Sequence, residues 1–145
     1  MPPHAKPGGC TCFQLRKLTR RITKHYDSRL APAGLRVTQY SLLANLRGGA
    51  LAMSALAAHM EMDRTTLTRS LKPLADAGLV EVVPGKDARS RIVSITERGR
   101  EAWSQARELW RRAQDEVNRA LGPDHVAALH ATLDESLARL KAGAR

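Results

Sequence analysis

The 145-residue sequence has only two cysteines and no long apolar run. Cys10 and Cys12 are separated by one residue, too close for a framework disulfide, and so sparse a use of cysteine is typical of a reducing compartment. No segment approaches the roughly 20 apolar residues that a membrane-spanning helix requires. Residues 1–9 contain no apolar stretch of the kind found in a secretory signal. We therefore expect a cytoplasmic protein in which residues 1–11 form a flexible tail.

Aromatic residues are also scarce, at 3% of the chain, whereas hydrophobic residues make up 43%. This balance is typical of a helix-rich fold built on Leu and Ala, and the length suits one domain. Acidic residues are outnumbered: 14 Asp and Glu stand against 24 Lys and Arg, which gives a net charge of +10. Such a charge favours polyanions, with nucleic acid first and an acidic membrane surface second.

The motifs of common enzyme sites are absent. The sequence has no phosphate-binding G-x-x-x-x-G-K-[ST] loop, no H-x-x-x-H metal pair and no G-x-S-x-G nucleophile motif. Cys10 and Cys12 supply two thiols, to which His4 or His25 would have to add, and nothing in their spacing fixes a metal geometry. We predict no enzyme, no cofactor and no metal site.

A basic amphipathic helix is predicted over residues 12–30. Its apolar positions recur at spacings of three and four: Leu15, Leu18, Ile22, Tyr26 and Leu30. Basic side chains occupy most of the remaining surface. Such a helix can lie on a membrane, but this apolar face is narrow and has no Trp, which disfavours membrane binding. Two shorter helices are predicted next, over residues 38–46 and 53–60.

The most informative stretch lies at residues 62–80. Asp63 is placed to cap a helix that Gly78 ends. Within this helix, Leu67, Leu71 and Leu74 form one buried stripe. The side chains off the stripe that suit base edges and phosphates are Arg64, Thr65, Thr68, Arg69 and Lys72. Alone, this helix is equally compatible with an ordinary surface helix, but the helix at 53–60 just before it predicts a helix-turn-helix.

A β-hairpin is predicted directly after this helix. Residues 80–83 and 91–95 are rich in β-branched side chains, and the polar turn between them contains Pro84 and Gly85. Lys86, Arg89 and Arg91 lie near the tip of the hairpin. Such a hairpin is the wing of a winged helix-turn-helix, so residues 35–96 are predicted to form a DNA-binding lobe.

Two long helices complete the chain. Thr96 caps a helix over residues 97–121, whose apolar side chains predict a coiled-coil-like seam: Trp103, Ala106, Trp110, Ala113, Val117 and Ala120. After a break at residues 122–123, the last helix carries another apolar face: Val126, Leu129, Leu133, Leu137 and Leu140. One small lobe cannot cover so much apolar surface, which favours self-association. Residues 12–34 and 97–145 are therefore predicted to form dimerisation helices around the lobe, in a mostly α fold with a small β-wing.

The order of these elements resembles the MarR family of bacterial transcriptional regulators. Four segments carry the resemblance over most of the chain: Leu35–Tyr40, Leu56–Arg69, Leu74–Val80 and Asp87–Gly99. The family usually has Thr or Ser at the position of Arg36, so the second helix is expected to be capped from Thr38.

The resemblance implies a homodimer whose terminal helices interleave and whose two lobes face one pseudo-palindromic duplex. It places five recognition-helix side chains in the major groove: Arg64, Thr65, Thr66, Thr68 and Arg69. It also places Arg89 in the minor groove, and implies that Asp87 orients a neighbouring arginine. The dimer interface is predicted to include Leu15, Leu18, Trp110, Val117, Leu133 and Leu137.

The sequence leaves the effector open. Cys12, at the start of the first helix, is similar in position to the reactive cysteine of the organic-peroxide-sensing branch of the family, and Tyr26 matches one tyrosine of that branch. Two other tyrosine positions hold Arg16 and Val37 here. A thiol switch with Cys10 as resolving partner therefore competes with a buried, inert cysteine at the dimer interface. Aromatic side chains offer a third possibility, a crevice for a small aromatic or phenolic acid lined by Tyr26, Tyr40 and the two tryptophans. The alternative for these four side chains is that they pack the core.

Two functions of different classes follow from these patterns. The first is a homodimeric, sequence-specific regulator, expected to be a repressor that a small ligand or an oxidant releases from its operator. The second is a non-specific, nucleoid-associated architectural protein, which the net charge alone would permit.

Overall fold

The computed structural model describes residues 8–143, so His4 and most of the predicted flexible tail lie outside the described residues. The elements run in the order α1 (Thr11–Leu30), the 3₁₀ turn η1 (Ala31–Ala33), α2 (Val37–Leu46), β1 (Leu51–Ala52), α3 (Met53–His59), α4 (Arg64–Asp76), β2 (Val80–Pro84), β3 (Arg91–Ile95), α5 (Glu97–Leu121) and α6 (Pro123–Gly143). The prediction of a mostly α fold with a small β-wing is confirmed.

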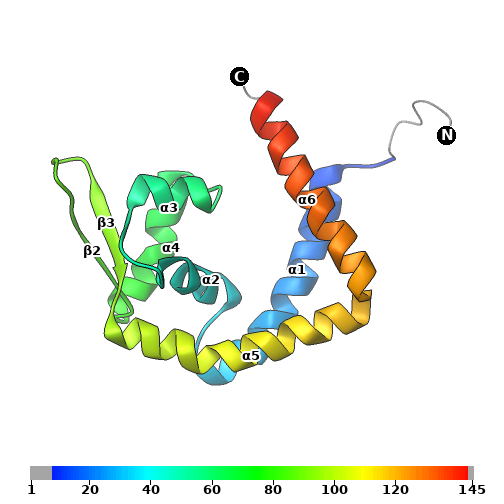
Figure 1. The fold of residues 1–145 in the computed structure, drawn as a ribbon, viewed down its shortest axis with the longest axis horizontal. Coiled ribbons are helices and arrows are strands. Elements are labelled where there is room, and N and C mark those ends of the chain that lie inside the picture. Colours follow the sequence, from blue (N-terminus) through cyan, green and yellow to red (C-terminus); the bar gives the residue numbers. More distant parts are fainter. Residues whose placement is uncertain (1–7, 144–145) are drawn as a thin grey trace.

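The long helix α5 joins two parts of the molecule (Figure 1). At one end α2, α3, α4 and the hairpin form a lobe, and at the other end α1 and α6 stand as an arm. Within residues 8–143 no helix is both long enough and apolar enough to cross a membrane.

The hydrophobic core lies within the lobe and under α5. The predicted stripe of α4 is fully buried there, together with leucines from α1, α2 and α3: Leu67, Leu71, Leu74, Leu30, Leu42, Leu43, Leu46 and Leu56. This core holds α4 with its opposite face outward, because the buried positions occupy only one side of the helix.

The sheet has three strands in the order β1-β3-β2, all antiparallel. The hairpin of β2 and β3 was predicted, but β1 was not. Its two residues pair Leu51 with Val93 and Ala52 with Ile92. A strand of two residues is too short to show the alternating pattern by which strands are recognised in a sequence.

The helix caps confirm two predictions and correct one. Asp63 Oδ1 accepts from the Thr66 amide at 2.7 Å, and Thr96 Oγ1 accepts from the Gly99 amide at 3.0 Å. The expected cap of α2 from Thr38 is wrong, because α2 already starts at Val37. Asp27 of α1 accepts from the Val37 amide at 2.8 Å, an acceptor supplied by another helix.

The predicted coiled-coil seam of α5 is used largely within the chain. Ala106 and Ala113 are buried, and Trp110 stacks on Tyr40 of α2 with ring centroids 5.6 Å apart. Trp110 therefore packs the lobe against α5 within one chain, while its place in a dimer interface stays a prediction. By contrast, α6 buries none of its described side chains, so its leucine face remains unpartnered in the single chain.

Candidate nucleic-acid interface

The exposed side of α4 lines a groove beside the hairpin. Its lining includes Met53, Leu71, Ala75 and Val82, together with five polar or basic side chains that were predicted from the sequence: Arg64, Thr65, Thr68, Arg69 and Lys72. The groove has a volume of about 640 Å³. A surface that combines guanidinium, hydroxyl and methyl groups suits the edges of base pairs and the phosphates beside them.

Three of the predicted side chains already have polar partners within α4 or its cap: Thr66, Lys72 and Thr68, whose Oγ1 donates to the Arg64 carbonyl at 2.8 Å. Thr66 Oγ1 donates to Asp63 Oδ2 at 3.0 Å, so Thr66 belongs to the cap of the helix. Hydrogen bonds from Thr66 hold the pKa of Asp63 below its ordinary value, and the bond from the Thr66 amide has the largest effect. Lys72 Nζ lies 3.0 Å from Asp76 Oδ2 in a highly exposed pair. Such a pair contributes little to stability, so the Lys72 ammonium stays available to a phosphate.

The wing tip is ordered by its own polar groups. Asp87 Oδ1 accepts from the amides of Arg89 and Ser90, each at 2.9 Å. The Gly85 amide donates to the Ser90 carbonyl at 2.9 Å, and a Cβ at Gly85 would lie 2.1 Å from Ser90 Oγ. The Asp87 carboxylate therefore folds the backbone of the turn, and it contacts the neighbouring Arg89 through the amide of that residue and not through its guanidinium. This is the pattern of an Asx turn, in which an Asp or Asn side chain accepts a hydrogen bond from the amide two residues later.

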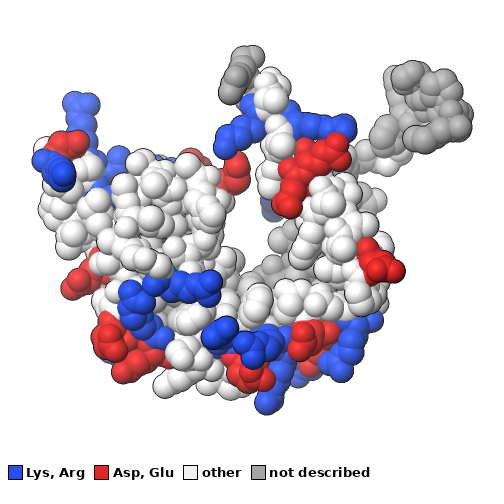
Figure 2. All heavy atoms as spheres, in the orientation of Figure 1, with Lys and Arg blue, Asp and Glu red and all other residues white. Residues whose placement is uncertain are grey.

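The wing and the recognition helix α4 are also joined directly. Arg64, the first residue of α4, donates from Nη2 to the carbonyl oxygen of Arg89 at 2.8 Å. Arg91 donates to the Ser90 carbonyl at 3.1 Å, and Lys86 is exposed. Lys and Arg side chains gather at the tip of the hairpin with an acidic side chain among them (Figure 2). The contact of Arg64 thus places the start of α4 beside the wing tip, which the sequence alone did not establish.

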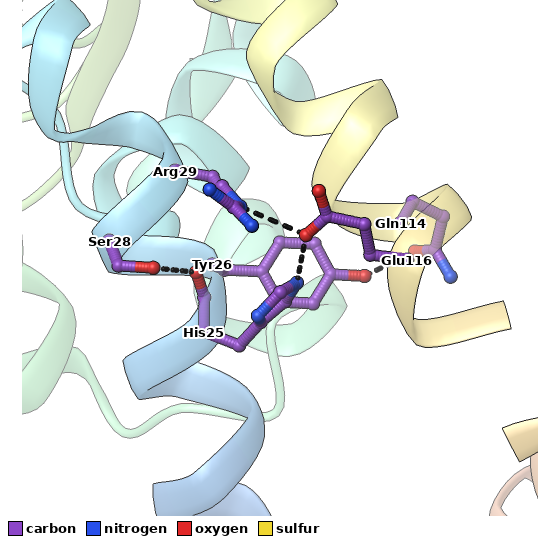
Figure 3. Close-up of polar contacts among 6 residues, drawn as sticks. All are labelled: His25, Tyr26, Ser28, Arg29, Gln114 and Glu116. Carbon is purple, nitrogen blue, oxygen red and sulfur yellow. Dashed lines mark hydrogen bonds and ion pairs between the residues drawn. The ribbon is translucent and has the colours of Figure 1, made fainter. Parts of the chain in front are cut away.

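A second polar network, separate from the wing, joins α1 to α5 (Figure 3). Tyr26 donates to Gln114 Oε1 at 2.5 Å, and the Glu116 carboxylate accepts from Arg29 Nε at 2.9 Å. That carboxylate oxygen also lies 2.9 Å from His25 Nε2, although without the geometry of a hydrogen bond. The hydrogen bond from Arg29 lowers the pKa of Glu116. Sequence patterns gave no signal for Gln114 or Glu116, because polar contacts across helices have no fixed spacing along a chain.

The two predicted effector tyrosines are both buried. Burial raises the pKa of each hydroxyl. Tyr26 belongs to the polar network between α1 and α5, whereas Tyr40 lies against Trp103 and Trp110. The structure therefore gives each tyrosine a packing contact and brings neither of them next to Cys12.

Both cysteines lie at the start of α1, where Cys10 is the N-cap residue and Cys12 is in the first turn. They are free thiols and both are exposed. Within residues 8–143 no group of three or more His, Cys, Asp or Glu side chains is placed to hold a metal ion.

Apolar side chains are exposed along α1 and α6. Four of the predicted interface residues belong to this set: Leu15, Leu18, Leu133 and Leu137, with Phe13 and Leu140 beside them. Val117 of α5 lines a broad groove of about 1160 Å³ between α1 and α5, together with Leu18, Ile22 and several basic side chains of α1.

Comparison with known proteins agrees with this architecture. The MarR family profile matches residues 33–90. The uncharacterized HTH-type transcriptional regulator YwoH of Bacillus subtilis (strain 168) is 31% identical over 84 residues, which are 57% of this chain. The chain spans about 61% of the length of YwoH. The crystal structure of the M. tuberculosis transcriptional regulator MosR in complex with DNA is 38% identical, with a TM-score of 0.80 over 91% of this chain and 98% of MosR.

The chain is a winged helix protein, as its lobe, its wing and its match to 98% of the length of MosR indicate. The chain belongs to the MarR family of transcriptional regulators. A mutant of MarR from E. coli complexed with operator DNA has a TM-score of 0.76 at 24% identity, over 86% of this chain and 91% of that one. At that identity the likeness concerns the fold alone.

Proposed function

We propose that this protein is a sequence-specific, DNA-binding transcriptional regulator and that it acts as a repressor. The observation that carries the proposal is the joint basic surface of α4 and the wing, in which Arg64, Thr65, Thr68 and Arg69 line one groove and Arg64 contacts the wing backbone. Membership in the MarR family supports it, as does the complex of MosR with DNA. The proposal includes no enzymatic activity and no cofactor, and it places the protein on double-stranded DNA in the cytoplasm.

In this proposal the exposed side of α4 enters the major groove. Arg69 would pair with a guanine edge or a phosphate, and the methyl groups of Thr65 and Thr68 suit thymine. The wing would approach the adjacent minor groove with Arg89, while Lys86 and Arg91 neutralise phosphates. Residues 35–96 would thus form the DNA-binding lobe.

The proposal also includes a homodimer formed by residues 12–34 and 97–145. Its support is the leucine face of α6, because Leu133 and Leu137 are 37% and 49% exposed on a helix that buries none of its described side chains. A two-fold dimer would present two lobes to half-sites about one helical turn apart.

The effector remains a choice between two chemistries. Exposed free thiols at Cys10 and Cys12 support an oxidant, because a reactive cysteine has to be accessible. The burial of Tyr26 and Tyr40 within the chain gives a small phenolic acid less support, since both aromatic rings already have partners.

The experiment that tests the regulator is DNase footprinting on the region upstream of its own gene, followed by competition with random DNA of equal length. We expect one protected palindromic site, and an affinity at least about a thousandfold higher than for random DNA. Arg89→Ala should weaken this binding and reduce its dependence on salt, because a basic contact is lost. Uniform protection of all sequences would instead support a non-specific architectural protein.

A further inference from the structure

The contact between Arg64 and Arg89 connects two parts of the lobe that are 25 residues apart in the sequence. The guanidinium of Arg64 reaches the carbonyl oxygen, so the acceptor belongs to the wing backbone and not to the Arg89 side chain. Among the described residues this is the only hydrogen bond between α4 and the loop over residues 85–90. The guanidinium can hold the tip of the wing while the Arg89 side chain remains free.

The wing loop has little else to fix its position. The side chains of Lys86, Asp87, Ala88 and Arg89 are exposed, and none of them is part of the hydrophobic core. Strand pairing extends only to Pro84 and Arg91. The hydrogen bonds of Asp87 stay inside the turn, so they set its shape but not its distance from α4.

The position of Arg64 in its helix supports a role in this contact. A cation in the first turn of a helix faces the positive end of the helix dipole, which is unfavourable. A carbonyl oxygen beside the guanidinium offsets that repulsion. The cap formed by Asp63 and Thr66 fixes the start of α4, so the Arg64 side chain extends from a rigid point.

We propose that Arg64 is a positioning residue that sets the spacing between the recognition helix and the wing. It does so by holding the backbone of the wing tip, so that Arg89 and the exposed side of α4 meet one duplex together. The inference rests on the proposed DNA binding, and it reassigns Arg64 from reading bases to orienting Arg89. Lysine cannot serve equally, because an ammonium lacks the planar fork of donors that lets arginine hold an oxygen at a defined angle.

The first test needs no DNA. Order in the wing is measured from ¹⁵N relaxation and amide hydrogen exchange of residues 86–90 in the free protein. Arg64→Gln and Arg64→Lys should both increase the mobility of these amides and speed their exchange severalfold. Thr65→Ala, which alters the neighbouring exposed side chain, should leave them unchanged. Unchanged wing amides in the Arg64 variants would overturn the proposal.

The second test is a double-mutant cycle on the operator. Arg89→Ala removes the side chain that would approach DNA but keeps the carbonyl that Arg64 holds. We expect Arg64→Gln to weaken binding about tenfold in the natural protein and less than about threefold in the Arg89→Ala background, because residues that act as one unit are not additive. An equal loss in both backgrounds would mean that Arg64 contacts DNA by itself, and would overturn the proposal.

The two tests separate the failure of this inference from the failure of the proposed function. If the natural protein binds random DNA as tightly as its operator, the regulator proposal fails. The relaxation measurement alone then decides whether Arg64 positions the wing. If the natural protein binds its operator and the cycle is additive, only the inference fails. Arg64→Lys adds a check, because its charge is kept: a loss of affinity with an unchanged salt slope supports positioning, whereas full affinity opposes it.

Discussion

The ring of Tyr40 in α2 lies parallel to that of Trp110 in α5, with centroids 5.6 Å apart and planes inclined by 14°. Trp103, two helical turns earlier in α5, stacks on the same tyrosine with a distance of 6.3 Å between ring centroids. This aromatic contact packs the DNA lobe against the helix that leads to the arm. It therefore gives both tryptophans of α5 a packing role inside one chain, which is one of the alternatives that the sequence left open for them.

Replacement of Trp110 should lower the stability of the single chain. We expect Trp110→Ala to reduce the free energy of unfolding by about 2–4 kcal/mol, since a large ring is lost from a partly buried stack. Trp110→Phe keeps an aromatic ring and should cost less than about 1.5 kcal/mol. Urea unfolding followed by circular dichroism checks both variants. A Trp110→Ala protein as stable as the natural one would show that the stack is not formed.

Gly99 should not tolerate a side chain. A Cβ at this position would lie 2.1 Å from the Leu79 carbonyl oxygen, which belongs to the backbone and cannot rotate away. Gly99→Ala should therefore destabilise the protein by about 1–3 kcal/mol through overpacking, despite the better helix propensity of alanine. Gly143→Ala, with no atom within 4 Å of the added Cβ, is the matched control. Thermal unfolding of the two variants should separate them clearly.

The cap of α4 should make stability depend on pH on the acid side. The pKa of Asp63 is lowered in the folded protein by hydrogen bonds from Thr66, so its contribution is complete above the unfolded pKa and is lost as pH falls through the folded one. Asp63→Asn should flatten the decline in melting temperature below about pH 4. Asp124→Asn is the control, because it removes the same negative charge as Asp63→Asn from a residue outside this cap. Parallel acid profiles of Asp63→Asn and the natural protein would contradict the assignment.

Self-association should depend on the leucine face of α6. Leu137→Glu places a charge on that face, where an ion without a partner is costly to bury. Analytical ultracentrifugation should then show monomers at concentrations at which the natural protein is dimeric. Ala131→Glu introduces the same charge on the opposite side of α6, where all described side chains are also exposed, and should leave the dimer intact. Dimers of Leu137→Glu would place the interface elsewhere.

Oxidation should act through the cysteines at the start of α1. If Cys12 is the sensing thiol, an organic peroxide should release operator DNA from the natural protein, and reductant should restore binding. Cys12→Ser should stay bound under oxidant, whereas Cys10→Ser should still respond if Cys10 only resolves the first product. Mobility shifts with each variant test this. Release by a small phenolic acid with no response to peroxide would favour the aromatic crevice instead.

Much of the architecture follows from local patterns in the chain. The stripe of Leu67, Leu71 and Leu74 specifies a helix with one buried face, because a period near 3.6 residues has no other regular explanation. Asp63 and Thr96 specify where α4 and α5 begin, since a capping side chain bonds to amides only three residues away. These features act over one or two turns, which is why they can be predicted without a partner segment.

Tertiary structure decided the contacts whose partners are far apart in the sequence. Asp27 caps α2 from α1, Gln114 receives the Tyr26 hydroxyl, and Arg64 holds the carbonyl of Arg89. None of these pairs has a characteristic spacing, because each depends on how two elements pack and not on the period of either one. The sequence by itself determined which side chains this protein presents on its recognition helix and wing, whereas only the packed lobe decided that Arg64 meets the wing and that Trp110 faces Tyr40.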